Sequence, residues 1–418
     1  MKSRLHYAAG LVSLTLLASA PADVIYSGYL GTSIPTNFTG VSVSVDGGTI
    51  NPFFGGVGVA NDANFQPVRT GTGGLDPIVN LAAGSTVDGS SVYSTGAGGS
   101  FTHEGTGSGQ FTAGTEGYLG MQLSGSNYGW MRVVFTNNTS GAVIKDWAYD
   151  NSGAAIIVGN ITQSAPSAGA QTVTLSSGSG QSFTLGTQIT DSLGNAGGVT
   201  NSVVKNDTGT AVLTGTNSYG GATTINAGKL VVTGSISNSA VTVSGTGAVL
   251  AAGATTTIGS SVVVHNGAIL AAGNAGVAAT ATVTGATTFN DGSIFSWDIN
   301  AAGTSYGKLV TSSLVDGGSA GGAVLRIVAA DSSFANTFWN TNRTWTDIFT
   351  TNGSTAIANW ANIFTSVSLV NSSFTSITPA GGFFTASGNT LTWTAVPEPG
   401  GALAGLLLGA GLLRRRRR

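Results

Sequence analysis

Histidines are the side chains of this sequence most suited to acid–base catalysis, and there are few of them. The three are His6, His103 and His265. His103 stands beside Glu104 and just before Gly105-Thr-Gly-Ser-Gly109, but this segment is low-complexity sequence, whereas a nucleophile elbow needs a strand-to-helix turn. A zinc hydrolase helix needs two histidines four residues apart around a glutamate, and the sequence has no such pair. We therefore expect no catalytic residue.

Paired carboxylates are the other route to catalysis, because glycoside cleavage requires two acids that converge in a cleft. Glutamates are scarce before Glu398, and Asp291 with Asp298 is the one nearby acidic pair in the repetitive part of the chain. A polysaccharide-modifying enzyme is thus a third functional alternative, and it requires these two carboxylates to meet. We expect no cofactor and no metal site.

Composition favours a β-rich exported protein. Charged residues are 8% of the 418, against about 25% in ordinary globular proteins, and there are 65 glycines. Hydrophobic residues still reach 41%, which argues against disorder, and short β-branched runs between Gly, Asn, Ser and Thr predict strands and turns. The absence of cysteine excludes disulfides and thiolate sites. Residues 23–395 hold 16 acidic and 8 basic side chains, so we expect no nucleic-acid partner.

The N-terminus has the three parts of a secretory signal peptide. Lys2 and Arg4 precede an apolar stretch from Leu11 to Leu17, and small residues follow. Cleavage sites end at Ala20 and Ala22, and the second is preferred because the first would leave a proline at the new N-terminus. Residues 1–22 are therefore the expected signal peptide.

The C-terminus predicts a short membrane stop. Residues 400–413 are apolar or glycine and would rise about 21 Å as a helix, less than the roughly 30 Å of a hydrocarbon core. Arginines at the end should stay on the cytoplasmic side of the inner membrane and leave the body outside. These membrane-stop residues are Arg414, Arg415, Arg416, Arg417 and Arg418.

The order of parts in this tail is more specific than its hydropathy. Val396-Pro397-Glu398-Pro399, an apolar Gly/Ala/Leu segment and a terminal arginine cluster resemble the PEP-CTERM sorting signal, here residues 396–418. The resemblance implies that Pro397, Glu398 and Pro399 are recognised by an exosortase, which processes the tail during delivery to the cell surface.

Residues 23–160 predict a β-sandwich whose core is aromatic. The progression Tyr118-Leu-Gly120, Tyr128-Gly-Trp-Met-Arg-Val133 and Asp146-Trp-Ala-Tyr149 resembles a domain seen ahead of many PEP-CTERM tails, which carries no catalytic residues. Trp130 and Trp147 most simply supply the core. The alternative is that they form a carbohydrate-stacking platform.

Residues 161–310 repeat with a period near 20, which is the pattern of a β-solenoid. Gly247-Ala-Val-Leu-Ala-Ala-Gly253 recurs as Gly267-Ala-Ile-Leu-Ala-Ala-Gly273, and Gly228-Lys-Leu-Val-Val-Thr-Gly234 lies nineteen residues before the first. Strands beginning at Ala240 and Ser261 are interleaved about 21 residues apart. Each rung of such a fold pairs with the next, so a ladder replaces a compact core.

One segment of this repetitive region also resembles a known repeat residue by residue. Residues 212–230, from Val-Leu-Thr-Gly-Thr-Asn-Ser-Tyr-Gly to Thr-Ile-Asn-Ala-Gly-Lys-Leu, resemble the autotransporter-associated β-strand repeat. The resemblance implies a passenger-type β-helix at a bacterial surface.

Together these patterns predict an all-β fold: an N-terminal β-sandwich followed by a β-solenoid (β-helix), with a short C-terminal hydrophobic helix. Residues 311–395 should form a β-rich cap over the open end of the solenoid. The expected function is that of an exported, non-enzymatic structural protein of the cell surface or extracellular matrix, associated with exopolysaccharide or biofilm. The second alternative is a carbohydrate-binding adhesin with exposed aromatics.

Overall fold

The computed structural model describes residues 23–94, 98–102, 110–194, 199–253, 256–274, 277–318, 322–330, 334–352, 355–379 and 381–396. The predicted signal peptide, the sorting segment from Pro397 onward with its helix, and the His103–Glu104 pair lie outside these residues. Within them the protein is all-β, as expected. The helical segments are short 3-10 turns: η1 (Phe54–Gly56), η2 (Ser124–Ser126), η3 (Thr337–Asn340) and η4 (Trp360–Asn362).

The N-terminal part is a sandwich of two antiparallel sheets. One has the order β3-β4-β5-β9, and in the other β12, β11, β10 and β6 are neighbours. The strands of the first are β3 (Val43–Val45), β4 (Gly48–Phe53), β5 (Gly58–Asn61) and β9 (Gly98–Phe101). Those of the second are β2 (Thr32–Ser33), β6 (Phe65–Pro67), β7 (Asn80–Leu81), β10 (Glu116–Leu123), β11 (Tyr128–Val134) and β12 (Val143–Asp150), while β8 (Thr86–Val87) pairs with β13 (Ile156–Ile157).

Alternating side chains of both sheets form one core between them. Val45 and Ile50 from the first sheet pack with Leu119, Met131 and Ile144 from the second, and each is at most 1% exposed. Period-two alternation puts every second residue of a strand on the same face, so a sheet with one apolar face must bury that face against another. The structure confirms the sandwich.

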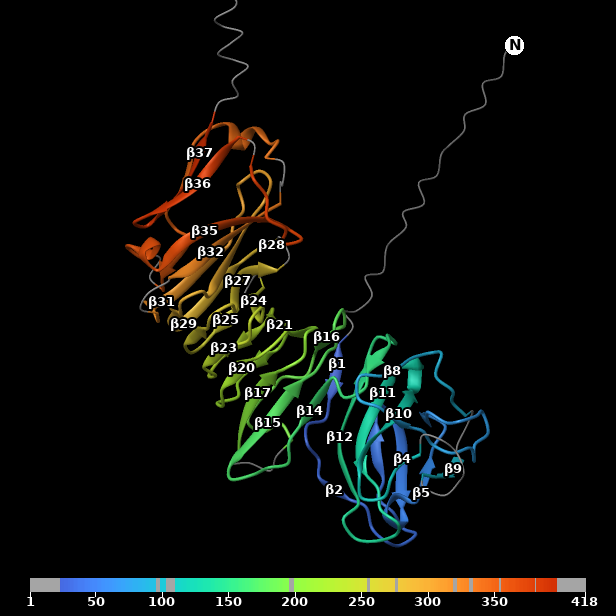
Figure 1. Ribbon diagram of the computed structural model, residues 1–418. Helices are drawn as coiled ribbons and strands as arrows, with labels where there is room; N and C mark the ends of the chain where they lie inside the picture. Colours follow the sequence, from blue (N-terminus) through green and yellow to red (C-terminus); the bar gives the residue numbers. More distant parts are fainter. Residues whose placement is uncertain are drawn as a thin grey trace, which may run out of the picture.

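A single strand, β1 (Val24–Tyr26), joins the sandwich to the second part of the molecule (Figure 1). It pairs antiparallel with β12, from Val24↔Asp150 to Tyr26↔Ala148, and parallel with β16 through Val24↔Leu185. One sheet therefore runs without a break from β6 in the sandwich to β35 near the C-terminus.

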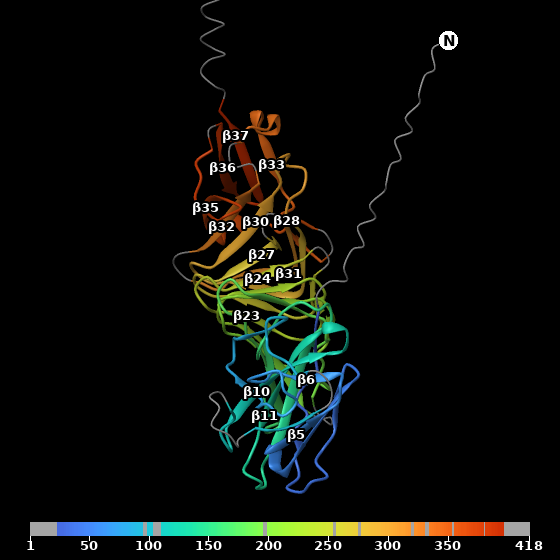
Figure 2. The same cartoon turned by 90° about the vertical axis from the view of Figure 1, so that its right-hand side faces the viewer.

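The second part is a parallel β-solenoid, in which the chain visits three columns of strands in turn (Figures 1 and 2). Column A continues the long sheet: β16 (Ser182–Leu185), β18 (Thr210–Leu213), β21 (Lys229–Val232), β24 (Val249–Ala252), β27 (Ile269–Asn274), β30 (Ile294–Ile299), β32 (Ala323–Ala329) and β35 (Phe364–Asn371). Column B contains β15 (Ala170–Leu175), β17 (Thr200–Lys205), β20 (Thr223–Ile225), β23 (Val241–Val243), β26 (Val262–Val264) and the ends of β29 (Thr280–Phe289) and β31 (Lys308–Asp316). Column C contains β19 (Thr216–Asn217), β22 (Ser235–Ile236), β25 (Thr257–Ile258), the starts of β29 and β31, and β34 (Phe349–Thr351).

The register confirms the repeat and corrects one alignment. Val249 pairs with Ile269 and Val241 with Val262, so the spacings of 20 and 21 are those of the ladder. Lys229 pairs with Val249, however, and not with Ala248, which the alignment of glycines had placed opposite it. A one-residue slip would turn Leu230 outward, whereas the observed register keeps it inside opposite Leu250.

Inward-facing side chains fill the solenoid. Leu230, Leu250, Leu270, Phe295 and Leu325 follow one another in register along column A, and each is 0% exposed. Corners need special residues. Gly228 has φ +65°, and a Cβ there would lie 2.2 Å from the carbonyl oxygen of Asp207, so this turn accepts only glycine without a shift of the neighbouring rung.

The ladder continues beyond residue 310, where the sequence predicted that it would end. Strands β31, β32, β34 and β35 still pair in parallel. Successive column A partners are 25 residues apart at Ile269↔Ile294 and 30 at Ile294↔Val324, so insertions at the corners hide the period without breaking the pairing. The cap itself is an antiparallel sheet of β33 (Arg343–Trp345), β36 (Gly382–Ser387) and β37 (Thr390–Ala395), packed through the buried Trp339, Trp345, Trp360 and Trp393.

Two short strands complete the structure. β14 (Ile161–Gln163) lies antiparallel to β15 and covers the first rung, and β28 (Val277–Ala278) forms a hairpin with β27.

Candidate functional site

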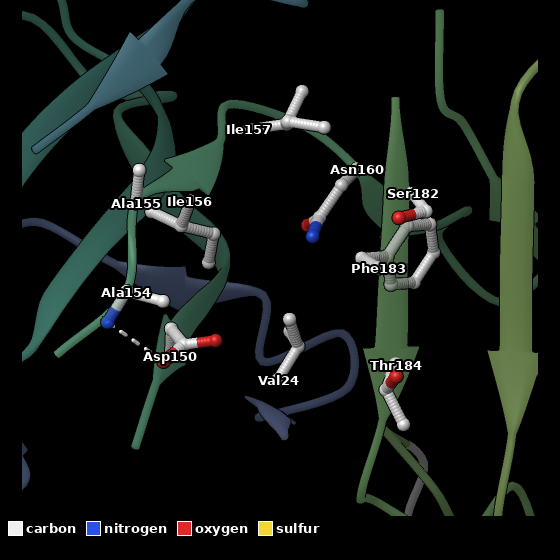
Figure 3. A pocket seen from close by; sticks show the side chains of 10 residues that line it. All are labelled: Val24, Asp150, Ala154, Ala155, Ile156, Ile157, Asn160, Ser182, Phe183 and Thr184. Carbon is white, nitrogen blue, oxygen red and sulfur yellow. Dashed lines mark hydrogen bonds between the residues drawn. The ribbon is translucent and has the colours of Figure 1, made fainter. Parts of the chain in front are cut away.

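A pocket lies where the sandwich meets the solenoid, beside the joining strand β1 (Figure 3). It has a volume of about 200 Å³ and is lined by three segments: Val24 of β1, the chain from Asp150 to Asn160, and Ser182 to Thr184 around β16. Val24, Ile156 and Phe183, which belong to the buried core, supply the apolar part of its walls.

Asn160 supplies the one unsatisfied polar group of this pocket. Its side chain is 1% exposed, and its Oδ1 accepts a hydrogen bond from Trp130 Nε1 at 3.2 Å. Its Nδ2 has no hydrogen-bond partner, and Figure 3 shows the amide directed into the cavity. A buried unpaired donor costs about 1–3 kcal/mol, so this amide favours a guest with an acceptor atom, such as water or a hydroxylated small molecule.

Asp150 is the one titratable group among the described lining residues. Its Oδ1 accepts hydrogen bonds from Ser152 N at 2.9 Å, Ser152 Oγ at 2.5 Å and Ala154 N at 3.2 Å, which shape the turn after β12. An Asx-type turn of this kind is structural. The pocket therefore offers hydrogen bonds and an apolar wall, and its described lining contains no pair of groups for acid–base catalysis.

A buried ion pair stands on the other side of β1. Arg132 of β11 donates to Asp146 of β12 from Nε at 2.9 Å and from a terminal nitrogen at 2.5 Å. The Tyr26 hydroxyl donates to the same carboxylate at 2.7 Å, and the Gln163 backbone N–H donates to it at 3.3 Å. Burial lowers the pKa of Arg132, but the adjacent Asp146 outweighs burial and raises it, so the guanidinium stays charged.

Gln163 extends this network into the solenoid. Its Oε1 accepts a hydrogen bond from Tyr29 N at 2.7 Å, and its Nε2 donates to Asn201 Oδ1, also at 2.7 Å. Side chains of β11, β12, β1, β14 and β17 thus form one connected polar cluster. Fully satisfied networks of this kind fix the relative position of the elements that carry them.

The two tryptophans of the predicted stacking platform lie in different environments. Trp130 is 0% exposed and packs against Tyr26 and Tyr118, so it belongs to the core and cannot stack on a sugar at the surface. This part of the platform prediction is wrong, because the ring is enclosed in the core, where β11 contacts β8 and β13 and the indole Nε1 donates to Asn160 Oδ1. Trp147 is half-buried beside Tyr149, with ring centroids 6.0 Å apart.

The acidic pair Asp291 and Asp298 does not converge. Asp291 precedes β30 and accepts a hydrogen bond from Gly322 N at a corner, whereas Asp298 lies near the far end of the same strand. Asp298 lines a hollow with Lys229 and Arg326, whereas Asp291 lines a different one with His265 and Asn290, so the two carboxylates do not flank one glycosidic bond. This removes the acid pair that the enzymatic alternative required.

The remaining sequence candidates have structural roles or lie outside the described residues. His265 Nδ1 is 2.9 Å from Asn290 Nδ2 at a solenoid corner. In the part of the chain that the structure describes, no three His, Asp or Glu side chains are grouped to hold a metal, and no helix is long and apolar enough to cross a membrane. The sorting residues Pro397, Glu398 and Pro399, the terminal arginines, and Ala20 and Ala22 lie outside it.

Comparison with known families identifies the repetitive segment. Residues 203–232 match the passenger-associated-transport-repeat. These residues run from β17 through β18 and β20 to β21, which is more than one full turn of the solenoid, and they confirm the autotransporter-associated part of the sequence reading. This repeat is typical of secreted or surface proteins. No curated protein matches the chain.

Asn160 and Gln163 were missed by the sequence analysis of sites. Both lie in the connection between the two parts, next to the Gly159 turn. The only signal was their polar character in a stretch otherwise rich in buried Ile and Val, which does not by itself distinguish a turn residue from a ligand.

Proposed function

We propose that this protein is an exported structural component of the bacterial surface or extracellular matrix. The observation that carries the proposal is the unbroken parallel ladder from β16 to β35, continued into the sandwich by β1. Such a stack has stiffness along its axis, because every rung is hydrogen-bonded to the next and shares one apolar core. The passenger-associated-transport-repeat within it supports a secreted or surface location.

The proposed route to the surface uses both ends of the chain. The signal peptide directs export and is cut after Ala20 or Ala22. The short apolar tail with Arg414 to Arg418 holds the protein in the inner membrane. An exosortase then recognises Pro397, Glu398 and Pro399 and releases the body to the extracellular polysaccharide.

Localisation of the native protein tests this proposal. Intact cells are treated with a protease or an antibody against the body, in the wild type and in a strain without the exosortase, and the mature C-terminus is determined by mass spectrometry. We expect surface exposure and a trimmed tail in the wild type. A triple substitution of Pro397, Glu398 and Pro399 by alanine should retain the protein in the membrane fraction, while the neighbouring Ala395→Ser should not.

A body found in the cytosol of wild-type cells would overturn the proposal. Surface exposure with an intact tail in both strains would instead remove only the exosortase from it.

A further inference from the structure

A groove lies on the outer face of column A, opposite the side that packs the core. Its volume is about 310 Å³, at the lower end of the range of roughly 300–1,000 Å³ for small-molecule pockets. Val249, Ile269 and Ala271, from β24 and β27, form its floor. Ile269 and Ala271 point away from the core but are only 7% and 8% exposed, so the groove combines a sheltered apolar floor with charged walls.

Two cationic side chains approach this floor from opposite sides. Lys229 comes from β21, and its Nζ reaches Asn274 Oδ1 of β27 at 2.5 Å. Arg326 comes from β32, where its Nε contacts Ser296 Oγ at 3.4 Å. The strands β24, β27 and β30 lie between β21 and β32. Lys229 and Arg326 nevertheless line the same groove, so each side chain extends over these intervening strands.

The aromatic wall of the groove is Phe374. Its ring lies 4.7 Å from the guanidinium carbon of Arg326, and the side chain is 51% exposed. The turn that presents it is held by Asn371, whose Oδ1 accepts hydrogen bonds from Ser373 N and Thr375 N at 2.9 Å. One face of the ring is therefore used by Arg326, and part of the ring remains open to a ligand.

The charges of the groove are positive on balance. Lys229 and Arg326 form no ion pair within 4.0 Å among the described residues, in contrast to Arg132, Lys145 and Lys308. Burial lowers the pKa of both Lys229 and Arg326, with the nearby Asp298 opposing it, so an additional anion would stabilise their charged forms. Two of the 8 basic residues between positions 23 and 395 therefore line this one groove.

We propose that this groove binds a uronic acid unit of an acidic polysaccharide. The carboxylate of the sugar accepts hydrogen bonds from Arg326 and Lys229, since guanidinium groups pair well with carboxylates. The C–H face of the ring packs on Val249, Ile269 and the open part of Phe374. A ring hydroxyl donates to the carboxylate of Asp298, which is 3% exposed at the end of the groove.

The same geometry disfavours more highly charged ligands. Asp298 and the net negative body repel a polyphosphate, whereas one carboxylate per sugar satisfies two cations without a second charge. The inference deepens the proposed association with exopolysaccharide by naming the chemistry of its sugar. It does not depend on the sorting tail.

Calorimetric titration of the purified full-length protein tests this inference, with oligomers of glucuronic acid and, as a matched neutral ligand, oligomers of glucose. We expect binding of the acidic oligomer only, weakening as sodium chloride is raised. Arg326→Gln and Lys229→Gln should each weaken it by about tenfold, the loss of one charge-assisted contact. Lys145→Gln, which removes a cation of the sandwich, should leave it unchanged.

Asp298→Asn separates recognition from mere structure. Removing its negative charge should tighten binding of the acidic oligomer, an outcome that a purely structural role does not produce. Equal binding of the neutral and acidic oligomers, or acidic binding that survives both cation substitutions, would overturn the inference. If Arg326→Gln lowers the thermal midpoint of the protein, its effect on binding is not used. Arg326→Lys, which keeps the charge, and the salt dependence of wild-type binding then test the role of this cation. A negative titration would leave the proposed surface localisation standing. Conversely, a protein found elsewhere in the cell would leave the result of the titration unchanged.

Discussion

Removal of the Asp146 carboxylate should strongly destabilise the junction between sandwich and solenoid. In Asp146→Ala, Arg132 loses two hydrogen bonds and its closest counter-charge, although its side chain remains only about 10% exposed. The Tyr26 hydroxyl and the Gln163 backbone N–H also lose their acceptor. Breaking a buried pair by removing one partner costs about 3–5 kcal/mol. Glu116, 3.7 Å from Arg132, retains part of the attraction, so we expect about 3 kcal/mol.

Urea unfolding followed by tryptophan fluorescence measures this cost, because Trp130 and Trp147 flank the network on β11 and β12. The double variant Arg132→Met with Asp146→Leu removes both charges and should recover most of the loss, since apolar replacement of a buried pair is often neutral. Lys145→Ala, which removes an exposed partner of Glu116, is the control and should change stability by less than about 1 kcal/mol. A loss below about 1 kcal/mol for Asp146→Ala, or a double variant as unstable as the single one, would refute the reasoning.

Three further predictions concern the solenoid and the buried phenols. Leu250→Ala should lower the free energy of unfolding by about 2–5 kcal/mol because it opens a cavity in the inward stack, whereas the outward Thr242→Ala should cost little; circular dichroism melting compares them. Gly228→Ala should destabilise the same ladder by more than the roughly 1 kcal/mol of an ordinary left-handed alanine, since its Cβ meets a backbone carbonyl, and an unchanged melting midpoint would contradict this. Burial raises the pKa of Tyr118 to about 12 and also raises that of Tyr26, while an unfolded tyrosine ionises near pH 10. Stability from these phenols is therefore full below about pH 10 and is lost as the pH rises toward 12. The share of phenolate absorbance that belongs to the buried tyrosines should appear together with unfolding.

The regular rungs could be predicted from sequence because their determinants are local. Gly247 to Gly253 and Gly267 to Gly273 have the same pattern of turn and strand, and the ladder pairs Leu250 with Leu270 as that pattern requires. The end of the solenoid could not be predicted in this way. Corner insertions lengthen the later rungs, so Leu325 pairs with Val367 across 42 residues, and no fixed period remains to be detected.

The sites were less accessible to sequence analysis, because each is assembled from distant segments. Lys229 and Arg326 are almost one hundred residues apart, and only the number of intervening rungs places them at one groove. The one hint was that cations are rare in a chain of this composition. The sequence left two environments open for Trp130. Its burial against Tyr26, Tyr118 and Asn160, which come from other segments of the chain, decides for the core.

The position of β1 has a consequence for how this chain is assembled during export. Residues 24–26 form the first described strand to be synthesised, but their hydrogen-bonding partners are residues 148–150 and 185. The leading strand can therefore pair with β12 only after more than 120 further residues have been added, and its other edge stays unpaired until residue 185 follows. The N-terminal sheet can thus close on β1 before the first coil of the solenoid is nucleated, so a chain arrested between residues 150 and 185 should leave the solenoid-facing edge of β1 open to proteases.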